Sequence, residues 1–372
     1  MNPRLTTLEP SLIRELNARK RPGDLDLGLG EPVLPPDQRA LDAGLRWLAE
    51  NGCRYSPNLG FPEVRAAVGA YLGRPAEEIC LTNGSQQALH LAMVTALDPE
   101  RDEVLVIEPG YPAYAKIAQM LGLAVRTVGL DPERHFAPEA ARVLNALRPE
   151  TRLVVLASPN NPTARIWPAN ELQELCAGLG ERWLVFDEVY RELYYTPEPP
   201  PRPSHQRALL VGGLSKCASL TGLRMGWLGA PTELMPLVLR AHQLITTAAS
   251  TFAQQVALEL LTHRRLGDQR PLYRERLDTL LEALRATGLE FVEPEGAFYC
   301  LVRVGRPSLA AALELLEQER VVTVPGVAFG AEGWLRLSWA GPAEDVREGV
   351  ARLARWTTGA RPADGPGPSG DL

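Results

Sequence analysis

Residues 153–190, LVVLASPNNPTARIWPANELQELCAGLGERWLVFDEVY, decide the fold class of this 372-residue chain. Two apolar, β-branched runs at 153–157 and 183–187 enclose a stretch at 169–179 whose apolar residues recur at helical spacing. A strand, a helix and a second strand in this order are typical of two parallel strands joined by a crossover helix. The segment therefore predicts an α/β fold.

The same alternation extends on both sides of this segment, from about residue 78 to 230. We expect further strands at 79–82, 104–108, 124–128, 209–212 and 225–229, and further helices at 84–97, 112–121 and 137–147. Such a pattern indicates a mostly parallel sheet, here of seven strands, with helices on both faces. Ligands of these sheets bind beyond the carboxyl ends of the strands.

The regions on either side of residues 78–230 differ in the order of their expected helices and strands. Helical spacing appears at 36–51 and 61–73, and again in long stretches at 231–262 and 270–287. A compact α+β block then follows, with strands expected at 290–293, 297–304, 321–324 and 334–338 and helices at 308–319 and 343–356. We predict four parts: an N-terminal arm that contributes to a small domain (1–45), a large domain (46–270), a C-terminal small domain (271–358) and a disordered tail (359–372).

Composition excludes several classes of function. The formal net charge of −6 argues against a nucleic-acid binder, which usually has a basic domain. No window approaches 18 continuous apolar residues, so we expect no membrane span. The five cysteines form no C-x-x-C pair and the five histidines have no metal-ligand spacing, so neither a disulfide framework nor a metal site is expected. A cytoplasmic protein is the expectation.

Only three of the 39 basic residues are lysines, namely Lys20, Lys116 and Lys216. Lys20 lies in a charged stretch beside a proline, and Lys116 lies in a helical stretch, so both are expected at the surface. Lys216 follows an apolar strand and lies among small residues in GGLSKCASLTGLR, 212–224, which makes it a candidate nucleophile for Schiff-base chemistry. Taken alone, an ordinary loop lysine remains the alternative.

Two motifs follow other strands of the predicted sheet. Asp187 ends the run WLVFD and can hold a nitrogen heterocycle in its protonated state; a metal-binding or helix-capping Asp-Glu pair is the alternative. Asn161, in SPNNPT, offers a donor and acceptors next to a proline, although Asn-Pro is also common in plain turns.

Two further motifs follow strands of the same predicted sheet, and they suit a phosphate and a planar ring. Gly84, Ser85 and Gln86 form a strand-to-helix turn whose free amides suit a phosphate, with an unspecialised turn as the alternative. This turn matches neither a Walker A nor a G-x-G-x-x-G motif. Tyr111, held between prolines in EPGYPAY, can lie against a planar ring or pack ordinarily.

Together these motifs resemble the class I and II pyridoxal-phosphate aminotransferases of fold type I, the aspartate aminotransferase-like family, over residues 26–353. The resemblance implies pyridoxal 5′-phosphate as cofactor. Lys216 looks like the lysine that binds it covalently and moves the substrate proton, Asp187 like the partner of the pyridine nitrogen, and Tyr111 like the residue stacked on the ring. Tyr190 and Asn161 are similar to the pair that binds the ring's phenolic oxygen.

The remaining carried-over roles concern the phosphate and the substrate. The residues similar to the family's phosphate ligands are Gly84, Ser85, Gln86, Ser215 and Arg224. Tyr55 resembles the tyrosine that reaches the phosphate of the neighbouring subunit, which implies a homodimer with shared sites. Arg336 is similar to the arginine that binds the substrate α-carboxylate, together with Asn161 and the backbone of Gly30.

Three positions depart from the family pattern. Ala164 stands where many relatives have glycine, and Gly213 stands where many place a serine or threonine on the phosphate. Residues 244–251 lack the arginine that dicarboxylate-specific members supply from the partner subunit. The resemblance therefore implies a ping-pong aminotransferase for aromatic or other neutral amino acids, with 2-oxoglutarate as acceptor. A carbon–sulfur β-lyase of the same fold is the alternative. A DNA-binding regulator of this family would need an additional N-terminal domain, and only about 25 residues precede the matching region.

Overall fold

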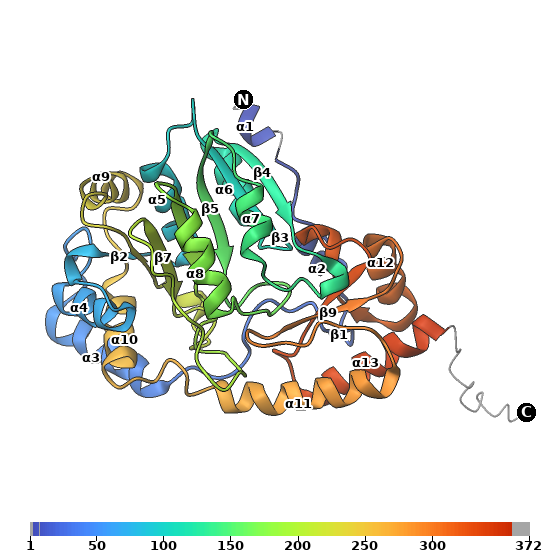
Figure 1. Cartoon of the computed structure of the whole chain (residues 1–372). Coiled ribbons are helices and arrows are strands. Elements are labelled where there is room, and N and C mark those ends of the chain that lie inside the picture. Colours follow the sequence, from blue (N-terminus) through green and yellow to red (C-terminus); the bar gives the residue numbers. More distant parts are fainter. Residues whose placement is uncertain (1–2, 7, 359–372) are drawn as a thin grey trace, which may run out of the picture.

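The computed structural model describes residues 3–6 and 8–358, and a seven-stranded sheet forms its centre (Figure 1). In spatial order the strands are β2 (Ile79–Thr82), β8 (Gly226–Gly229), β7 (Ala208–Gly213), β6 (Trp183–Asp187), β5 (Thr151–Ala157), β3 (Glu103–Glu108) and β4 (Ala124–Gly129). β8 is antiparallel to both of its neighbours, and the other neighbouring strands are parallel. The predicted α/β class with a mostly parallel sheet is confirmed.

The central strands are apolar at nearly every position because helices cover both faces of the sheet. In β5, Leu153 and Val155 belong to one buried cluster, whereas Val154 and Leu156 belong to the other. The helices that contribute buried residues to the first cluster are α5 (Ser85–Ala96), α6 (Ala113–Leu121) and α9 (Met235–Ile245). Those that contribute to the second include α4 (Pro62–Leu72), α7 (Ala140–Asn145), α8 (Ala169–Gly178) and α10 (Thr251–Thr262).

A smaller α+β unit follows the long helix α11 (Arg270–Thr287). Its antiparallel sheet has the order β11 (Val324–Pro325), β12 (Trp334–Ser338) and β9 (Tyr299–Arg303), and its helices are α12 (Ser308–Glu319) and α13 (Ala343–Thr358). A short parallel pair joins β10 (Val321–Val322) to β1 (Leu25–Asp26), so the beginning of the chain lies against this unit. The three boundaries between the four predicted parts stay predictions, and residues 359–372 lie outside the described residues.

Two expectations differ from the structure, and a third is made definite. The two or three helical stretches expected at 231–262 and 270–287 are three helices, because Thr247 has a φ of +66° and Ser250 accepts a hydrogen bond from the Ala253 amide at the start of α10. The expected strand at 290–293 is reduced to a single bridge between Phe291 and Val302. The N-terminal arm contains two helices that periodicity did not reveal, α1 (Pro3–Thr6) and α2 (Leu12–Ala18), before α3 (Gln38–Asn51).

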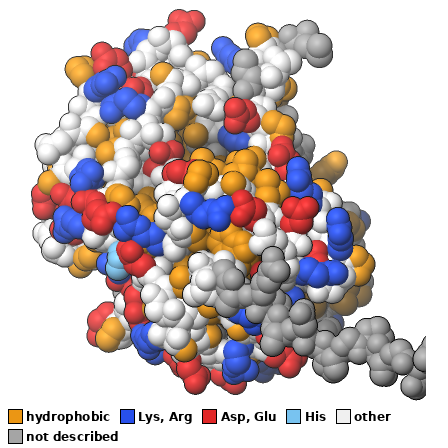
Figure 2. Space-filling view, turned by 90° about the vertical axis from the view of Figure 1, so that its right-hand side faces the viewer, with side chains coloured by type: hydrophobic (Ala, Val, Ile, Leu, Met, Phe, Trp, Pro, Cys, Tyr) orange, Lys and Arg blue, Asp and Glu red, His pale blue; other side chains and the backbone are white. Residues whose placement is uncertain are grey.

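Figure 2 shows the face that carries the C-terminal unit. Hydrophobic side chains gather near its middle, and charged side chains of both signs surround them. Within residues 3–6 and 8–358, no helix is long and apolar enough to cross a membrane.

Candidate active site

A pocket at the carboxyl edge of the large sheet brings together most of the residues predicted from the sequence. Those that line it are Gly30, Ser85, Gln86, Tyr111, Asn161, Asp187, Tyr190, Ser215, Lys216, Arg224 and Arg336. The strands β2, β5, β6 and β7 end beside it, whereas Arg336 comes from β12 of the smaller sheet. The pocket is therefore built at the junction of the two sheets.

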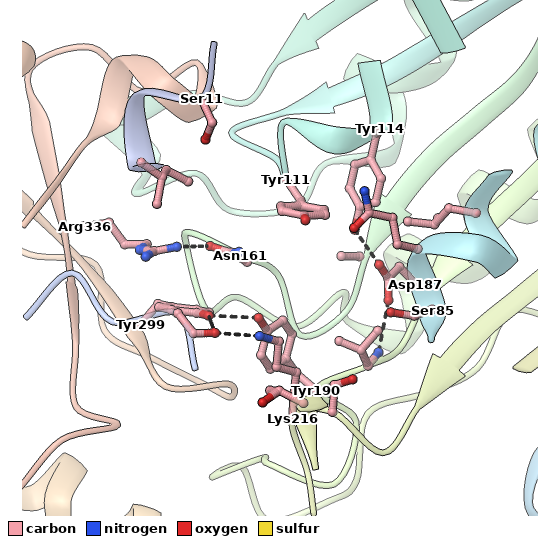
Figure 3. Close-up of a pocket in the computed structure, with 18 of the residues that line it drawn as sticks. Ser11, Ser85, Tyr111, Tyr114, Asn161, Asp187, Tyr190, Lys216, Tyr299 and Arg336 are labelled. Atoms are coloured by element: carbon pink, nitrogen blue, oxygen red, sulfur yellow. Dashed lines mark hydrogen bonds between the residues drawn. The ribbon is translucent and has the colours of Figure 1, made fainter. Parts of the chain in front are cut away.

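Lys216 lies three residues beyond β7 and extends into this pocket (Figure 3). Its Nζ donates a hydrogen bond to the carbonyl oxygen of Gly30 at 2.5 Å. Burial and, after it, the positive charge of Arg336 together lower the pKa of Lys216 to about 8. A substantial part of this amine is therefore neutral, and hence nucleophilic, near physiological pH.

Asp187 ends β6 and is the one carboxylate among the residues that line the pocket. Its Oδ2 accepts a hydrogen bond from the Tyr114 hydroxyl at 2.9 Å, and its Oδ1 accepts one from the Val189 amide at 3.1 Å. Burial raises the pKa of Asp187 to about 6, although these two hydrogen bonds act in the opposite direction. A protonated nitrogen beside this carboxylate would favour its ionised form.

The turn between β2 and α5 could hold a phosphate. Gly84 precedes α5 with a φ of +85°, and no side chain caps the helix, so its first amides have no intrahelical acceptor. A Cβ on Gly84 would lie only 2.3 Å from Nη2 of Arg224. Arg224 donates to the Thr221 carbonyl at 3.0 Å and has no acidic partner among residues 3–6 and 8–358. Helix amides and a guanidinium thus meet where glycine leaves room for them.

Arg336 is a second cation without a counter-ion. It is 2% exposed, and its guanidinium donates to Oδ1 of Asn161 at 3.0 Å and to the Gly28 carbonyl at 2.8 Å (Figure 3). Within the described part of the chain it makes no salt bridge, and its Nε has no hydrogen-bond partner. Because a buried charge is costly unless it is paired, this arrangement favours an anionic ligand.

Tyr299 connects several of the predicted residues. Its hydroxyl lies 2.9 Å from the Tyr190 hydroxyl and 3.3 Å from the Gly30 carbonyl, and its ring lies 4.3 Å from the Arg336 guanidinium carbon. Tyr299 therefore fixes the orientation of two residues that the sequence had singled out. In the sequence, only its position in the expected strand 297–304 marks Tyr299. In the structure, this strand pairs with the strand of Arg336.

Other pocket residues were also missed. Tyr114 comes from α6 and was quoted only as part of the Tyr111 motif, although it bonds to Asp187. Ser11, Ile13 and Arg14 reach the pocket from α2 and the residue before it. No motif marks these positions, because their role depends on where the arm folds back and not on local sequence.

Two predicted site residues are not in the pocket lining, namely Tyr55 and Gly84, and Gly84 directly precedes the lining residue Ser85. Tyr55 is 86% exposed and lies beside residues 248–252, outside the pocket of its own chain. Gly213 lies within β7, where an added Cβ would come within 2.7 Å of the Met225 carbonyl oxygen. A serine there would collide with the neighbouring strand β8 unless the backbone shifted.

Pyridoxal phosphate, which the sequence resemblance implies, fits the chemistry of these side chains. The amides at Ser85 and Gln86 with Arg224 could hold its phosphate, Asp187 its pyridine nitrogen and Lys216 its carbonyl carbon. Asn161 uses Oδ1 for Arg336, so its Nδ2 could donate to the phenolic oxygen beside Tyr190. The unpaired guanidinium of Arg336 is left for a substrate carboxylate.

Comparisons with known proteins find relatives over nearly the whole chain. The model of the family described as aminotransferase class I and II matches residues 22–353. An aspartate/prephenate aminotransferase of Thermus thermophilus is 35% identical, with 95% of this chain and 97% of the relative covered. A probable N-acetyl-LL-diaminopimelate aminotransferase of Bacillus subtilis is 34% identical over 95% and 94% of the two chains. The crystal structure of an aspartate aminotransferase from Thermotoga maritima has a TM-score of 0.91 at 29% identity and covers 96% of this chain and all of that one.

Proposed function

We propose that this chain, which belongs to the class I and II aminotransferase family, transfers the amino group of an aromatic or other neutral amino acid to 2-oxoglutarate. The family and its pyridoxal phosphate-dependent transaminase activity rest on the comparisons above. The substrates and the individual residue roles are our proposal. The observation that carries it is the pairing, in one pocket, of a partly neutral lysine with a buried arginine that lacks a counter-ion.

In the proposed mechanism, each residue has a separate task. Arg336 binds the substrate α-carboxylate through two parallel hydrogen bonds and thereby directs the Cα–H bond toward Lys216. Bound pyridoxal phosphate supplies an electron sink for the charge that develops at Cα. Asp187 stabilises positive charge on the heterocyclic nitrogen, and Nζ of Lys216 removes the proton from Cα as a general base. The ammonium group formed in this way would then donate the proton, as a general acid, to the cofactor carbon that Lys216 had bound and not back to Cα.

The proposed donor preference rests on residues 244–251, LITTAAST, which contain no cation. A neutral stretch at this position favours neutral side chains over aspartate. The Thermus relative is named for aspartate and prephenate, so its name includes one substrate with a ring. We therefore propose aromatic donors first among the neutral ones.

We also propose a homodimer with shared sites. Tyr55 and Leu244 are 86% and 84% exposed, and Tyr55 lies beside the 248–252 segment that follows α9. Large apolar side chains this exposed favour burial against a second copy. In such a dimer, the Tyr55 hydroxyl would donate to the phosphate in the partner's pocket. Sedimentation of the purified protein tests the dimer, and a Tyr55→Phe variant with weakened cofactor binding would support the shared site.

A cytoplasmic location completes the proposal. All five cysteines are free thiols, and four of them are buried. Free thiols persist in a reducing compartment. Fractionation of the source cells tests this location.

Replacement of Lys216 tests the core of the proposal. Lys216→Ala should abolish both the visible absorbance of the bound cofactor and amino transfer, because no other amine lines the pocket. Lys20→Ala serves as the control that keeps both, since this amine contacts Asp26 instead. Lys116→Ala should keep the absorbance, since the Lys116 amine contacts the Glu9 carbonyl and does not line the pocket. Retained visible absorbance and amino transfer in Lys216→Ala would contradict the proposed role of Lys216.

A donor panel tests the substrates. Phenylalanine, tyrosine, leucine and aspartate are each supplied with 2-oxoglutarate, and glutamate formation is measured. Faster transfer from aspartate than from every neutral donor would contradict the proposed preference. Formation of pyruvate and ammonia from cystathionine without an oxo acid would identify the enzyme as a β-lyase instead.

A further inference from the structure

The N-terminal arm forms one wall of the active-site pocket. Ser11, Ile13 and Arg14 line the pocket, and Figure 3 shows Ser11 beyond Tyr111 on the side away from Lys216. Two contacts hold this wall in place. Leu16 is buried in the main hydrophobic cluster, and Nζ of Lys116 donates to the carbonyl oxygens of Glu9 and Pro10 at 2.9 and 3.4 Å. The arm is therefore fixed on both sides of Arg14.

The charges of the pocket do not balance. Four cations line it, Arg14, Lys216, Arg224 and Arg336, against the single carboxylate of Asp187. In the proposed function, Lys216 binds the cofactor, Arg224 its phosphate and Arg336 the α-carboxylate. Arg14 alone has no assigned anion, and its guanidinium has no hydrogen-bond or ion-pair partner among residues 3–6 and 8–358.

Arg14 acts on the same side of the pocket as Tyr111. Burial and the charge of Asp187 raise the pKa of the Tyr111 hydroxyl, and Arg14 is the first of three arginines that oppose this shift, before Arg224 and Arg336. Tyr111 lies where the planar ring is proposed to stack. Arg14 thus belongs to the wall that the arm forms near Tyr111.

We propose that Arg14 forms a second anion subsite, which binds the distal carboxylate of the acceptor 2-oxoglutarate while Arg336 binds the carboxylate next to the reacting carbon. The inference rests on the proposed function and names the residue that recognises its acceptor. The arm of the same chain then supplies a cation that residues 244–251 do not. Because Arg14 is exposed, its guanidinium stays hydrated when a neutral side chain occupies the pocket.

Calorimetry on the holoenzyme with two unreactive acids of equal chain length tests the subsite. Glutarate has a carboxylate at each end, whereas pentanoate has one. Wild type should bind glutarate more tightly than pentanoate. Arg14→Gln should weaken the affinity for glutarate about tenfold, or 1.4 kcal/mol, and leave the affinity for pentanoate unchanged. Arg14→Lys should recover part of the loss because it keeps the charge without the planar fork.

Arg19→Gln is the matched control, because Arg19 is an exposed arginine at the other end of α2 that does not line this pocket. It should change neither affinity. Unchanged glutarate binding in Arg14→Gln, or equal binding of the two acids by wild type, would overturn the subsite. A wild type that transfers amino groups from no donor would instead contradict the proposed function, so the two failures are distinguishable.

Discussion

The pocket has two halves that differ in how the chain builds them. In the sheet-edge half, every side chain flanks a strand of the large sheet: Ser85, Asp187, Lys216 and Arg224. The junction half comes from the N-terminal arm and the smaller sheet: Gly30, Tyr299 and Arg336. The sheet-edge half keeps its shape as long as the large sheet does. The junction half also requires the smaller unit to lie correctly against it.

This difference fits two kinds of ligand. A group that stays bound through many turnovers benefits from a rigid site within one folded unit. Substrates enter and leave, and a half-site on a separate unit can release them without disturbing the rest. We infer that changes in the sheet-edge half will affect cofactor retention, whereas changes in the junction half will affect substrate turnover.

The largest effect is expected in the junction half, for Arg336→Met. The loss of a buried, hydrogen-bonded charge from substrate binding costs about 4 kcal/mol, so kcat/KM should fall roughly a thousandfold. The cofactor dissociation constant should stay within about twofold, since the hydrogen bonds of Arg336 within the described residues go to Asn161 and Gly28 and not to the phosphate-binding turn. Steady-state kinetics and cofactor titration measure the two quantities. A comparable rise in the cofactor dissociation constant of Arg336→Met would contradict the proposed separation of cofactor retention from substrate turnover.

The next effect concerns Lys216, which lies where the halves meet. Its pKa of about 8, against an ordinary 10.5, raises the neutral fraction of the amine at pH 7 roughly three hundredfold. Competitive labelling of the apoenzyme with trace acetic anhydride should therefore show Lys216 reacting with a midpoint near pH 8. In Arg336→Met the midpoint should move upward, because a neighbouring positive charge no longer disfavours the ammonium form. An unmoved midpoint would mean that the halves are electrostatically independent.

A smaller effect is expected in the sheet-edge half, for Gly84→Ala. The new Cβ would displace the Arg224 guanidinium, and the φ of +85° adds strain of about 1 kcal/mol or more, so cofactor affinity should fall about tenfold. At saturating cofactor, the substrate KM should be unchanged. Gly222→Ala is the control, since nothing lies within 4 Å of its added Cβ. A KM that rises with the cofactor dissociation constant would contradict the proposed separation.

The same division explains what the sequence could predict. In the sheet-edge half, a short run such as WLVFD predicts both the strand and the place where Asp187 leaves it, because burial on both faces makes the strand uniformly apolar. The lysine was found because only three were available. These local signals predicted the sheet and made Ser85, Asp187 and Lys216 candidates, each with an alternative, whereas Arg224 was predicted only from the family resemblance.

The junction half depends on contacts between distant parts of the chain. Arg336 meets Asn161 across 175 positions and Gly28 across 308, and no local pattern encodes either approach. Family resemblance supplied Arg336 and Gly30, but Tyr299 and the arm residues were missed. The arm helix α2 is only seven residues long, too short for a clear periodic signal.

The smallest effect is expected where the two halves are joined, at Ala164. Its buried side chain lies at a φ of +57°, and its carbonyl accepts the amides of Glu295 and Gly296 at 3.0 Å, which ties the Asn161 loop to the smaller unit. Ala164→Gly would relieve strain of about 1 kcal/mol. Loss of the buried methyl group would cost about 0.8 kcal/mol of stability. The greater conformational entropy of glycine in the unfolded chain would cost about 0.5 to 1 kcal/mol more. We therefore expect the free energy of unfolding to fall by less than about 1 kcal/mol.

Urea denaturation measures this change, and kcat/KM should stay within about twofold of wild type because Ala164 does not line the pocket. A loss larger than about 2 kcal/mol would show that the methyl group, and not the carbonyl, holds the two units together. A fall in kcat/KM with unchanged stability would show that the loop orients Asn161 toward Arg336. In that case the junction half would extend into the large sheet, and the boundary drawn between the halves would have to move.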